Sequence, residues 1–382
     1  MTYYRRVGDV PRKRHIVHRA PDGSRYLKEL MGTEGFSRAS SLLYHRNSPS
    51  ALLSLEPLDT SAPTGQPTLG SPLHLRTSSL STGSDVVRDR TVLMANSDVR
   101  LAIASGTGTS TLYRNSFGDE LVYVHDGSAT LESVFGAVGV TAGDYVVIPA
   151  GTTHRWVSEG DLRMLVFDAS GHVRPPKRYL SPDGQFLEAT PYCERDIRGP
   201  DEPLLADDPG PAEVLVRTRE GLALHCYAHH PFDVAGWDGF LYPWALSIHD
   251  FEPIVGSLHQ PPPVHQTFEG PNFVICSFVP RPYDFHPEAV KIPYHHANVD
   301  SDEVIFYADG DFMSRAGAGI GVGSITLHPA GFTHGPQPGS WEKSLDKDRT
   351  SELAVMLDTF RPLDVTDAAR AIADDNYLRS WL

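Results

Sequence analysis

The sequence has little cysteine and no long apolar run. Only Cys193, Cys226 and Cys276 are cysteines among 382 residues, and no two of them stand in a CxxC pattern. This spacing predicts free thiols in a reducing compartment rather than a disulfide framework or a zinc knuckle. No window reaches about 18 uninterrupted apolar residues, and residues 1–15 lack the apolar segment of a secretory signal. We therefore expect a cytoplasmic protein.

Positive charge is also in short supply. The chain has 48 Asp and Glu against 33 Lys and Arg, which gives a formal net charge of -15. That excess argues against nucleic acid or an anionic membrane as a partner, because long-range attraction would be absent. The one tight basic cluster, at residues 11–15, is interpreted as a solvated N-terminal arm.

Proline and glycine are abundant and divide the chain into short segments. Most segments between them alternate apolar and polar residues, as in LVYVHDG at 121–127, DYVVIPAG at 144–151 and NFVICSFVP at 272–280. Alternation with a period of two is typical of half-buried antiparallel strands. The fold class is therefore predicted to be mainly β.

Helices are expected in a few places only. A short helix is predicted near residues 24–32, and helical stretches are predicted over 350–363 and 365–382, where Thr366 could cap the second one. Residues 56–83 are rich in Ser, Thr, Pro and Gly and are predicted to form a long surface connection. A second loop-like region, roughly 174–212, separates two strand-rich halves.

One pattern of spaced residues occurs twice. In the first half it runs E-x6-G from Glu120, then G-x5-P-x-G-x-x-H from Gly143 to His154. In the second half the same two patterns run from Glu303 and from Gly323 to His334. The chain therefore contains two copies of one structural unit.

The repeated pattern resembles the two motifs of the cupin superfamily. The C-terminal copy fits the core of the first motif as H-x-N-x4-E-x6-G, beginning at His296, and fits the second motif without a mismatch. The resemblance implies a double-stranded β-helix, or jelly roll, in each half. We expect an N-terminal arm and irregular region over 1–84, a first cupin half over 85–172, a connecting region over 173–240 and a second cupin half over 241–382.

The C-terminal motifs bring together candidate metal ligands. Successive side chains of an extended strand alternate faces, so His296 and Asn298 can point into one barrel lumen, where Glu303 and His334 can join them. Two imidazoles and one carboxylate are the ligand set of non-haem Fe(II) oxygenases. His295 should face the opposite side of the strand and is the main rival of His296. Asp300 and Asp302 are interpreted as loop or strand-edge residues.

The N-terminal copy lacks one of these ligands. Tyr113 stands where the second copy has His296, while Asn115, Glu120 and His154 are retained. Phenolate can bind iron, but we favour a half that has kept its barrel and lost its metal. One active centre per chain is therefore predicted.

Residues 240–380, and more weakly 85–170, resemble homogentisate 1,2-dioxygenase. The segments that carry this resemblance are IPYHHANVDSDE, SITLHPAGFTHGP and LHQPPPVHQTF. It implies Fe(II) held by His296, Glu303 and His334, a base at His259 with His265 as a competing candidate, and His328 beside the substrate or the oxygen. Arg281 is the candidate cation for a substrate carboxylate, and Asn298 is a second candidate substrate contact.

The resemblance implies ring cleavage of a para-dihydroxylated aromatic acid by dioxygen, preferably of homogentisate to maleylacetoacetate, in an enzyme that is a homo-oligomer. A neutral histidine is a suitable base for a phenolic proton near neutral pH. Alternatives are a cupin dioxygenase acting on gentisate or another hydroquinone, a metal-dependent cupin isomerase, and a non-catalytic bicupin binding protein.

Overall fold

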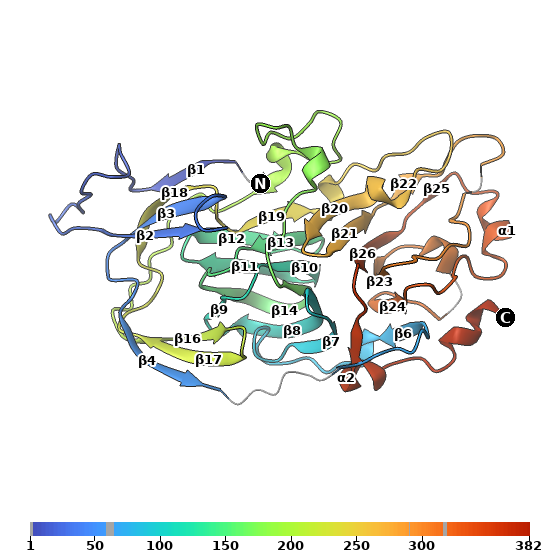
Figure 1. Ribbon diagram of the computed structural model, residues 1–382, viewed down its shortest axis with the longest axis horizontal. Coiled ribbons are helices and arrows are strands. Elements are labelled where there is room, and N and C mark those ends of the chain that lie inside the picture. Colours follow the sequence, from blue (N-terminus) through green and yellow to red (C-terminus); the bar gives the residue numbers. More distant parts are fainter. Residues whose placement is uncertain (1–2, 59–64, 290, 316–318) are drawn as a thin grey trace.

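The computed structural model describes residues 3–58, 65–289, 291–315 and 319–382. Over these ranges the chain is mainly β, as the alternation predicts, and Figure 1 shows two groups of curled sheets side by side. The α-helices among the described residues are two short ones, α1(Ser340–Ser344) and α2(Asp367–Arg370). None of the described helices is long and apolar enough to cross a membrane.

The N-terminal half is built on one large sheet. Its central path runs β15(Ile197–Arg198), β19(Trp244–Ser247), β13(Asp144–Ile148), β10(Glu120–Asp126), β14(His154–Ala169), β8(Val99–Thr109), β7(Thr91–Ala95), β27(Asp364–Thr366) and β5(Gly65–Gln66). Attached to this path are β11(Ser128–Ser133), β12(Gly136–Thr141), β9(Tyr113–Asn115), β16(Ala212–Arg217), β17(Leu222–Tyr227) and β4(Leu52–Pro57). A separate sheet of β1(Arg5–Gly8), β18(Val234–Gly239), β3(Ser40–His45) and β2(Leu27–Gly32) lies beside it (Figure 1).

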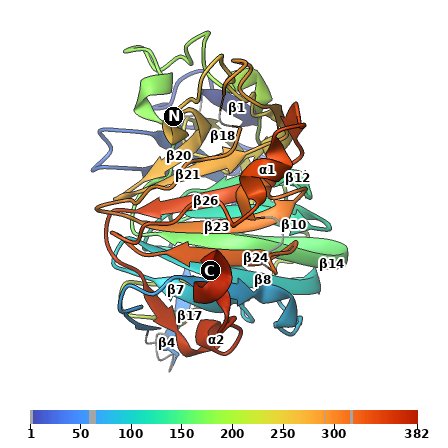
Figure 2. The same ribbon diagram turned by 90° about the vertical axis from the view of Figure 1, so that its right-hand side faces the viewer.

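The C-terminal half has its own sheet, which faces the viewer in Figure 2. The strand order is β20(Gln266–Gly270), β21(Phe273–Phe278), β26(Leu353–Thr359), β23(Asp302–Asp309), β24(Ser324–His328) and β6(Leu73–Arg76). A small ribbon of β22(Arg281–Pro282) and β25(Arg349–Thr350) flanks it. The 3-10 helices are η1(Thr77–Ser79), η2(Lys177–Tyr179), η3(Glu194–Asp196), η4(Ile248–Asp250), η5(Pro262–His265), η6(Met313–Arg315) and η7(Tyr377–Trp381).

The two halves share one hydrophobic core. Tyr123 on β10 packs edge-on against Phe306 of the other half, and Tyr145 on β13 packs edge-on against Phe268, with ring centroids 6.2 Å and 5.1 Å apart. The hydroxyl of Tyr145 is 2.8 Å from that of Ser277, so the buried phenol has a polar partner. Because side chains alternate along a strand, the remaining residues of β10 and β23 face the two barrel lumens.

Each half also receives a strand from outside its motif region. β6 pairs with β24 and so completes the C-terminal sheet, although it precedes the first cupin motif. β19 pairs with β13 of the N-terminal sheet, although it lies just before the C-terminal strands. The two halves are therefore interlocked by their connecting segments.

The two copies repeat in structure as well as in sequence. Asp119 accepts a hydrogen bond from the backbone N–H of Ala150 at 2.8 Å, and Asp302 accepts one from Ala330 at the same distance. Each aspartate thus ties the first motif of its half to the second. Asp302 is buried and joins the two motifs of its half, so the interpretation of Asp302 as a loop or strand-edge residue is incomplete.

The glycine that ends each first motif is required by its surroundings. Gly127 and Gly310 have φ values of 86° and 96°, which L side chains rarely adopt. A Cβ at these positions would stand 2.2 Å from the carbonyl oxygen of Asp161 and 2.0 Å from that of Ser351. The repeated E-x6-G spacing therefore marks a turn that only glycine fits.

Three local predictions were wrong. Residues 27–32 form strand β2 rather than a helix, and residues 353–359 form β26, which is buried between β21 and β23. Residues 56–83, expected to be a surface connection, include the sheet strand β6. The prediction of a helix capped at Thr366 is confirmed for α2 alone, where the Thr366 hydroxyl accepts from the N–H of Ala369 at 3.2 Å. Pairing with β3 for residues 27–32, and with β21 and β23 for residues 353–359, overrides the local helix preference of Leu, Glu and Met.

Candidate metal centre

Three segments of the C-terminal half bring the predicted ligands together. Glu303 lies near the start of β23, and His296 and His334 lie outside named strands in two segments joined by an antiparallel bridge. In that bridge each histidine donates its backbone N–H to the carbonyl oxygen of the other, at 2.8 Å and 2.9 Å. The two halves of the site are thus fixed by the main chain.

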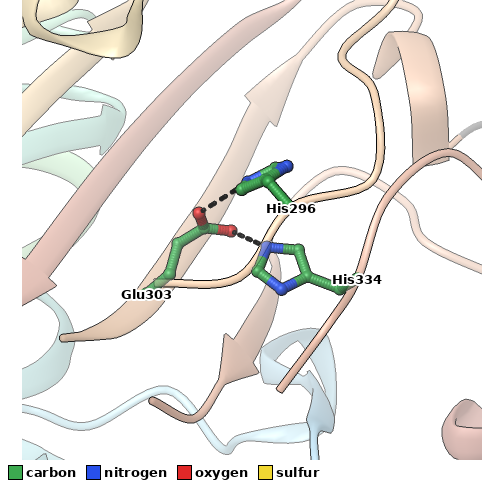
Figure 3. A group of neighbouring side chains, drawn as sticks. All are labelled: His296, Glu303 and His334. Carbon is green, nitrogen blue, oxygen red and sulfur yellow. Dashed lines mark ion pairs between the residues drawn. The ribbon is translucent and has the colours of Figure 1, made fainter. Parts of the chain in front are cut away.

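The three side chains converge on one point (Figure 3). Nε2 of His334 lies 3.2 Å from one carboxylate oxygen of Glu303, and Nε2 of His296 lies 3.7 Å from the other. The two imidazole rings meet edge to face, with centroids 4.5 Å apart. His334 is 2% exposed and His296 is half-buried, so the site opens on the side of His296.

The ring nitrogens that face Glu303 are free to act as ligands. Nδ1 of His296 is 2.9 Å from the carbonyl oxygen of Tyr294, and Nδ1 of His334 is 2.9 Å from that of Phe332. A carbonyl only accepts, so each Nδ1 carries a proton, and each Nε2 is the ring nitrogen left to bind a metal. This is how histidine ligands of metals are usually oriented.

Glu303 is held by a third histidine behind it. Nδ1 of His328 lies 2.9 Å from a carboxylate oxygen of Glu303, and Nε2 of His328 lies 2.9 Å from the hydroxyl of Tyr377. Burial would raise the pKa of Glu303, but the surrounding imidazoles of His296, His328 and His334 hold that pKa well below its usual range. Burial, aided by Arg315, lowers the pKa of His328 to about 3, so this imidazole is neutral.

The predicted role of His328 beside the substrate or the oxygen stays a prediction. His328 is 1% exposed, it stacks on His334 with ring centroids 4.1 Å apart, and both of its nitrogens are already engaged. These contacts favour a residue that positions Glu303 over one that bonds a substrate.

The residues present fit a divalent metal ion. One ligand atom each from His296, Glu303 and His334 lies within 4.8 Å of the others. Nε2 of His334 is buried and has no hydrogen-bond partner among the described residues, which is costly unless a ligand occupies that position. An imidazole pair with one carboxylate suits non-haem iron and leaves coordination positions open.

His295, the rival of His296, points elsewhere. Its side chain is exposed, and a Cβ on Gly335 would stand 2.7 Å from its ring. The glycine of the His-Gly-Pro stretch thus leaves room for the neighbouring histidine. The metal-facing position belongs to His296 in this geometry.

A separate small cavity is lined by His259, His265 and Arg281. The ring of His259 contacts that of Tyr294. Nδ1 of His259 lies 3.8 Å from a carboxylate oxygen of Asp284, and Arg281 pairs with Glu352 at 3.3 Å. His265 is buried, and burial lowers its pKa to about 3. No hydrogen bond, ion pair or ring contact joins these three residues to the three ligands within the described ranges. Their roles stay predictions.

Asn298 contributes its backbone to the site. Its carbonyl oxygen accepts a hydrogen bond from the N–H of Gly331 at 2.6 Å, as that of Asn115 does from Gly151 at 2.8 Å. The contact is shared by both copies, but it uses no side-chain atom and does not test the predicted substrate contact of the Asn298 side chain.

Sequence reasoning missed the residues that surround the centre. Arg315 is buried, donates to the carbonyl oxygen of Gly335 at 2.8 Å and lies over the ring of Trp381 at 5.4 Å. Tyr377 and Trp381, on η7, pack against His328. No motif marks Arg315, Tyr377 or Trp381. Only the place of Tyr377 and Trp381 in an aromatic C-terminal segment could have drawn attention to those two.

In the N-terminal copy an arginine stands next to the retained glutamate. Arg90 donates to Glu120 at 2.6 Å and lies over the ring of Tyr113 at 5.1 Å. Nε2 of His154 is 3.6 Å from the other oxygen of Glu120. Burial lowers the pKa of His154 to about 4, so it is neutral. A guanidinium thus supplies beside Glu120 the positive charge that a metal would supply beside Glu303.

Comparisons with known proteins agree with this architecture. A cupin-domain family model matches residues 99–169. The chain is 40% identical to a Saccharolobus solfataricus protein named "Putative dioxygenase", over 100% of this chain and 99% of that one. It is 25% identical to the homogentisate 1,2-dioxygenase of Emericella nidulans over 68% of this chain, which spans 59% of that enzyme.

Among solved structures, a cupin 2 conserved barrel domain protein from Leptotrichia buccalis aligns with 75% of this chain and 96% of its own, at 10% identity and a TM-score of 0.35. That score adds no argument about function. The full-length identity of 40%, together with the duplicated motifs, decides the family. The chain belongs to the cupin superfamily, in a family of dioxygenase-like proteins that is distantly related to the homogentisate 1,2-dioxygenases.

Proposed function

We propose that this protein is an Fe(II)-dependent dioxygenase that cleaves the ring of a para-dihydroxylated aromatic acid, with homogentisate as the preferred substrate. The observation that carries the proposal is the convergence of two Nε2 atoms and one carboxylate at a site that opens on one side. Full-length identity to a dioxygenase-named protein and partial identity to homogentisate 1,2-dioxygenases support it.

His296, Glu303 and His334 would hold the iron. Fe(II) in such a site supplies Lewis acidity, open coordination positions and the one-electron chemistry that dioxygen requires. His328 keeps the carboxylate of Glu303 turned toward the two imidazoles, and the hydroxyl of Tyr377 fixes the tautomer of His328. Residues behind the ligands of metal sites commonly have this orienting role.

The substrate contacts are assigned to the side of the site near Tyr294. His259 remains our candidate for the group that takes a phenolic proton, since its ring lies 5.5 Å from that of Tyr294, whose carbonyl oxygen accepts from His296. Arg281 is the candidate for the substrate carboxylate, with Asn298 as a second contact. Arg315 is a further buried cation, which donates to the carbonyl oxygen of Gly335 next to His334.

The direct experiment measures oxygen uptake by the Fe(II)-loaded protein. Addition of homogentisate should consume one dioxygen per substrate and yield an absorbing, ring-opened acid that contains both oxygen atoms. Uptake with gentisate or hydroquinone but not with homogentisate would reassign the substrate. An isomerised product with no oxygen uptake would contradict the dioxygenase.

The duplicated motif offers a matched pair of variants. His334 and His154 end the same motif in the two halves, and each donates Nδ1 to a backbone carbonyl two residues before it. We expect His334→Gln to lose iron and oxygen uptake, and His154→Gln to keep one iron per chain. Iron content is measured by metal analysis, and thermal unfolding checks that both variants fold. Retention of full iron by His334→Gln would refute the site.

A further inference from the structure

The lumen of the N-terminal half contains a cavity that the proposed dioxygenase reaction does not use. Its volume is about 670 Å³, within the ~300–1,000 Å³ that small-molecule sites usually have. Residues of strands β7, β8, β9, β14 and β16 line it. Its walls are partly apolar, with Val92, Val99 and Leu215 among the lining residues.

Arg90, Arg100 and Arg217 are three of the five arginines that line this cavity. The side chains of Arg90 and Arg217 are 10% and 9% exposed, and Arg217 lies 3.2 Å from Asp168. Arg100 also lines it, and no side-chain hydrogen bond or ion pair joins Arg100 to another residue in the described part of the chain. Burial and the neighbouring charge of Arg217 lower the pKa of Arg100. Such a group gains from an anion nearby.

The charges around this cavity do not balance. The guanidinium groups of Arg90, Arg100 and Arg217 face the two carboxylates of Glu120 and Asp168. His154 is neutral and adds no charge. Burial raises the pKa of Asp168 to about 6, together with the charge of Glu120 and against the opposing effect of Arg217. In mildly acidic solution Asp168 is therefore partly protonated, and the cluster carries still less negative charge. A single added anion would neutralise the cluster.

Unused hydrogen-bond donors accompany the unbalanced charge. Nη2 of Arg90 is buried and has no hydrogen-bond partner among the described residues, and Nη1 of Arg217 contacts Asp168 only as an ion pair at 3.2 Å. Buried donors of this kind are rare unless a ligand or water satisfies them. Of the other charged lining residues, Arg88 and Arg219 outnumber Glu220, and Asp98 pairs with Arg361 at 3.5 Å, so the excess charge of the lining is positive.

We propose that the N-terminal barrel binds a small monocarboxylate with an apolar body, whose carboxylate is held by Arg90, Arg100 and Arg217 and whose body packs against the apolar wall. Arginine pairs recognise a planar carboxylate with two parallel hydrogen bonds. The half that lacks the second imidazole would thus have kept its lumen as a binding site. The inference does not depend on the dioxygenase activity of the other half.

The test is calorimetric titration of the full-length protein with phenylacetate, in wild type and in His334→Gln. Both should bind one phenylacetate at the N-terminal site, because that site does not involve the predicted metal ligands. Arg100→Gln should weaken this binding by about 10- to 100-fold, the loss expected for a charged hydrogen bond. Arg100→Lys, which keeps the charge without the fork, should give an intermediate loss.

The controls locate and define the site. The neutral analogue 2-phenylethanol should not bind detectably, and thermal unfolding should show that the Arg100 variants fold. Absence of phenylacetate binding to wild type, equal binding of 2-phenylethanol, or tighter binding of inorganic phosphate would overturn the proposal. So would loss of binding in His334→Gln with full retention in Arg100→Gln, since that result places the ligand in the other half.

Discussion

Replacement of His328 by phenylalanine tests how Glu303 is held. The change keeps an aromatic ring that can stack on His334, but it removes the donor to Glu303 at 2.9 Å and the acceptor of the Tyr377 hydroxyl at 2.9 Å. A lost hydrogen bond to a charged group costs about 1.5–3 kcal/mol, and a stranded buried hydroxyl costs about 1–3 kcal/mol. The free energy of unfolding should therefore fall by about 2.5–6 kcal/mol.

The metal affinity should fall as well. Loss of a residue that orients a ligand typically weakens metal binding about 10- to 100-fold, which is about 1.4–2.7 kcal/mol. Anaerobic titration of Fe(II) against a competing chelator measures this affinity, and urea unfolding measures stability.

The double variant His328→Phe with Tyr377→Phe separates the two contributions. It removes the stranded hydroxyl, so it should recover about 1–3 kcal/mol of stability while iron affinity stays low. Iron affinity within twofold of wild type in His328→Phe would refute the reasoning, and so would an equal loss of affinity in Tyr377→Phe alone.

Three further outcomes are expected. Arg90→Ala removes the cation that donates to the buried Glu120, so urea unfolding should show a free energy of unfolding lower by about 3–5 kcal/mol. Adding Glu120→Gln to the same chain should partly restore this stability. Burial lowers the pKa of His45, but hydrogen bonds to Asp233 and Glu29 raise it to about 9. The protonated His45 should therefore add about 3 kcal/mol to the free energy of unfolding below about pH 6.5, and this contribution should disappear as pH rises through about 9. His45→Gln should lack this pH dependence. Fe(II) at 100 times its dissociation constant should add about 2.7 kcal/mol of stability, measured as a rise in melting temperature that a chelator reverses and that His334→Gln lacks.

Much of the candidate site could be predicted because its ligands lie in short motifs. The spacing from His296 to Glu303 and from Gly323 to His334 is fixed by one bridge, one strand and one turn, and the same local geometry recurs in the first half. Interactions within such short segments leave a regular signature in the sequence. The strand-rich class could be predicted for the same reason, from alternation along each strand.

The predictions that failed concern contacts between distant segments. Residues 353–359 contain good helix formers, yet they form β26 because strands on both sides bury it. Residues 73–76 look like part of a linker, yet they pair with β24, far along the chain. Local propensity is worth less than the burial gained in a sheet, so it is overridden.

The sequence by itself determined the duplication, the barrel class and the identity of three converging side chains, because each depends on spacing along a strand or a turn. Only the tertiary structure decided what surrounds them. It joined His328 to Tyr377 across 49 residues and set Arg90 against Glu120 across 30. The residues that the fold buries beside a carboxylate decide how its charge is compensated. The same glutamate position therefore lies beside three histidines in one half, and beside an arginine and one histidine in the other.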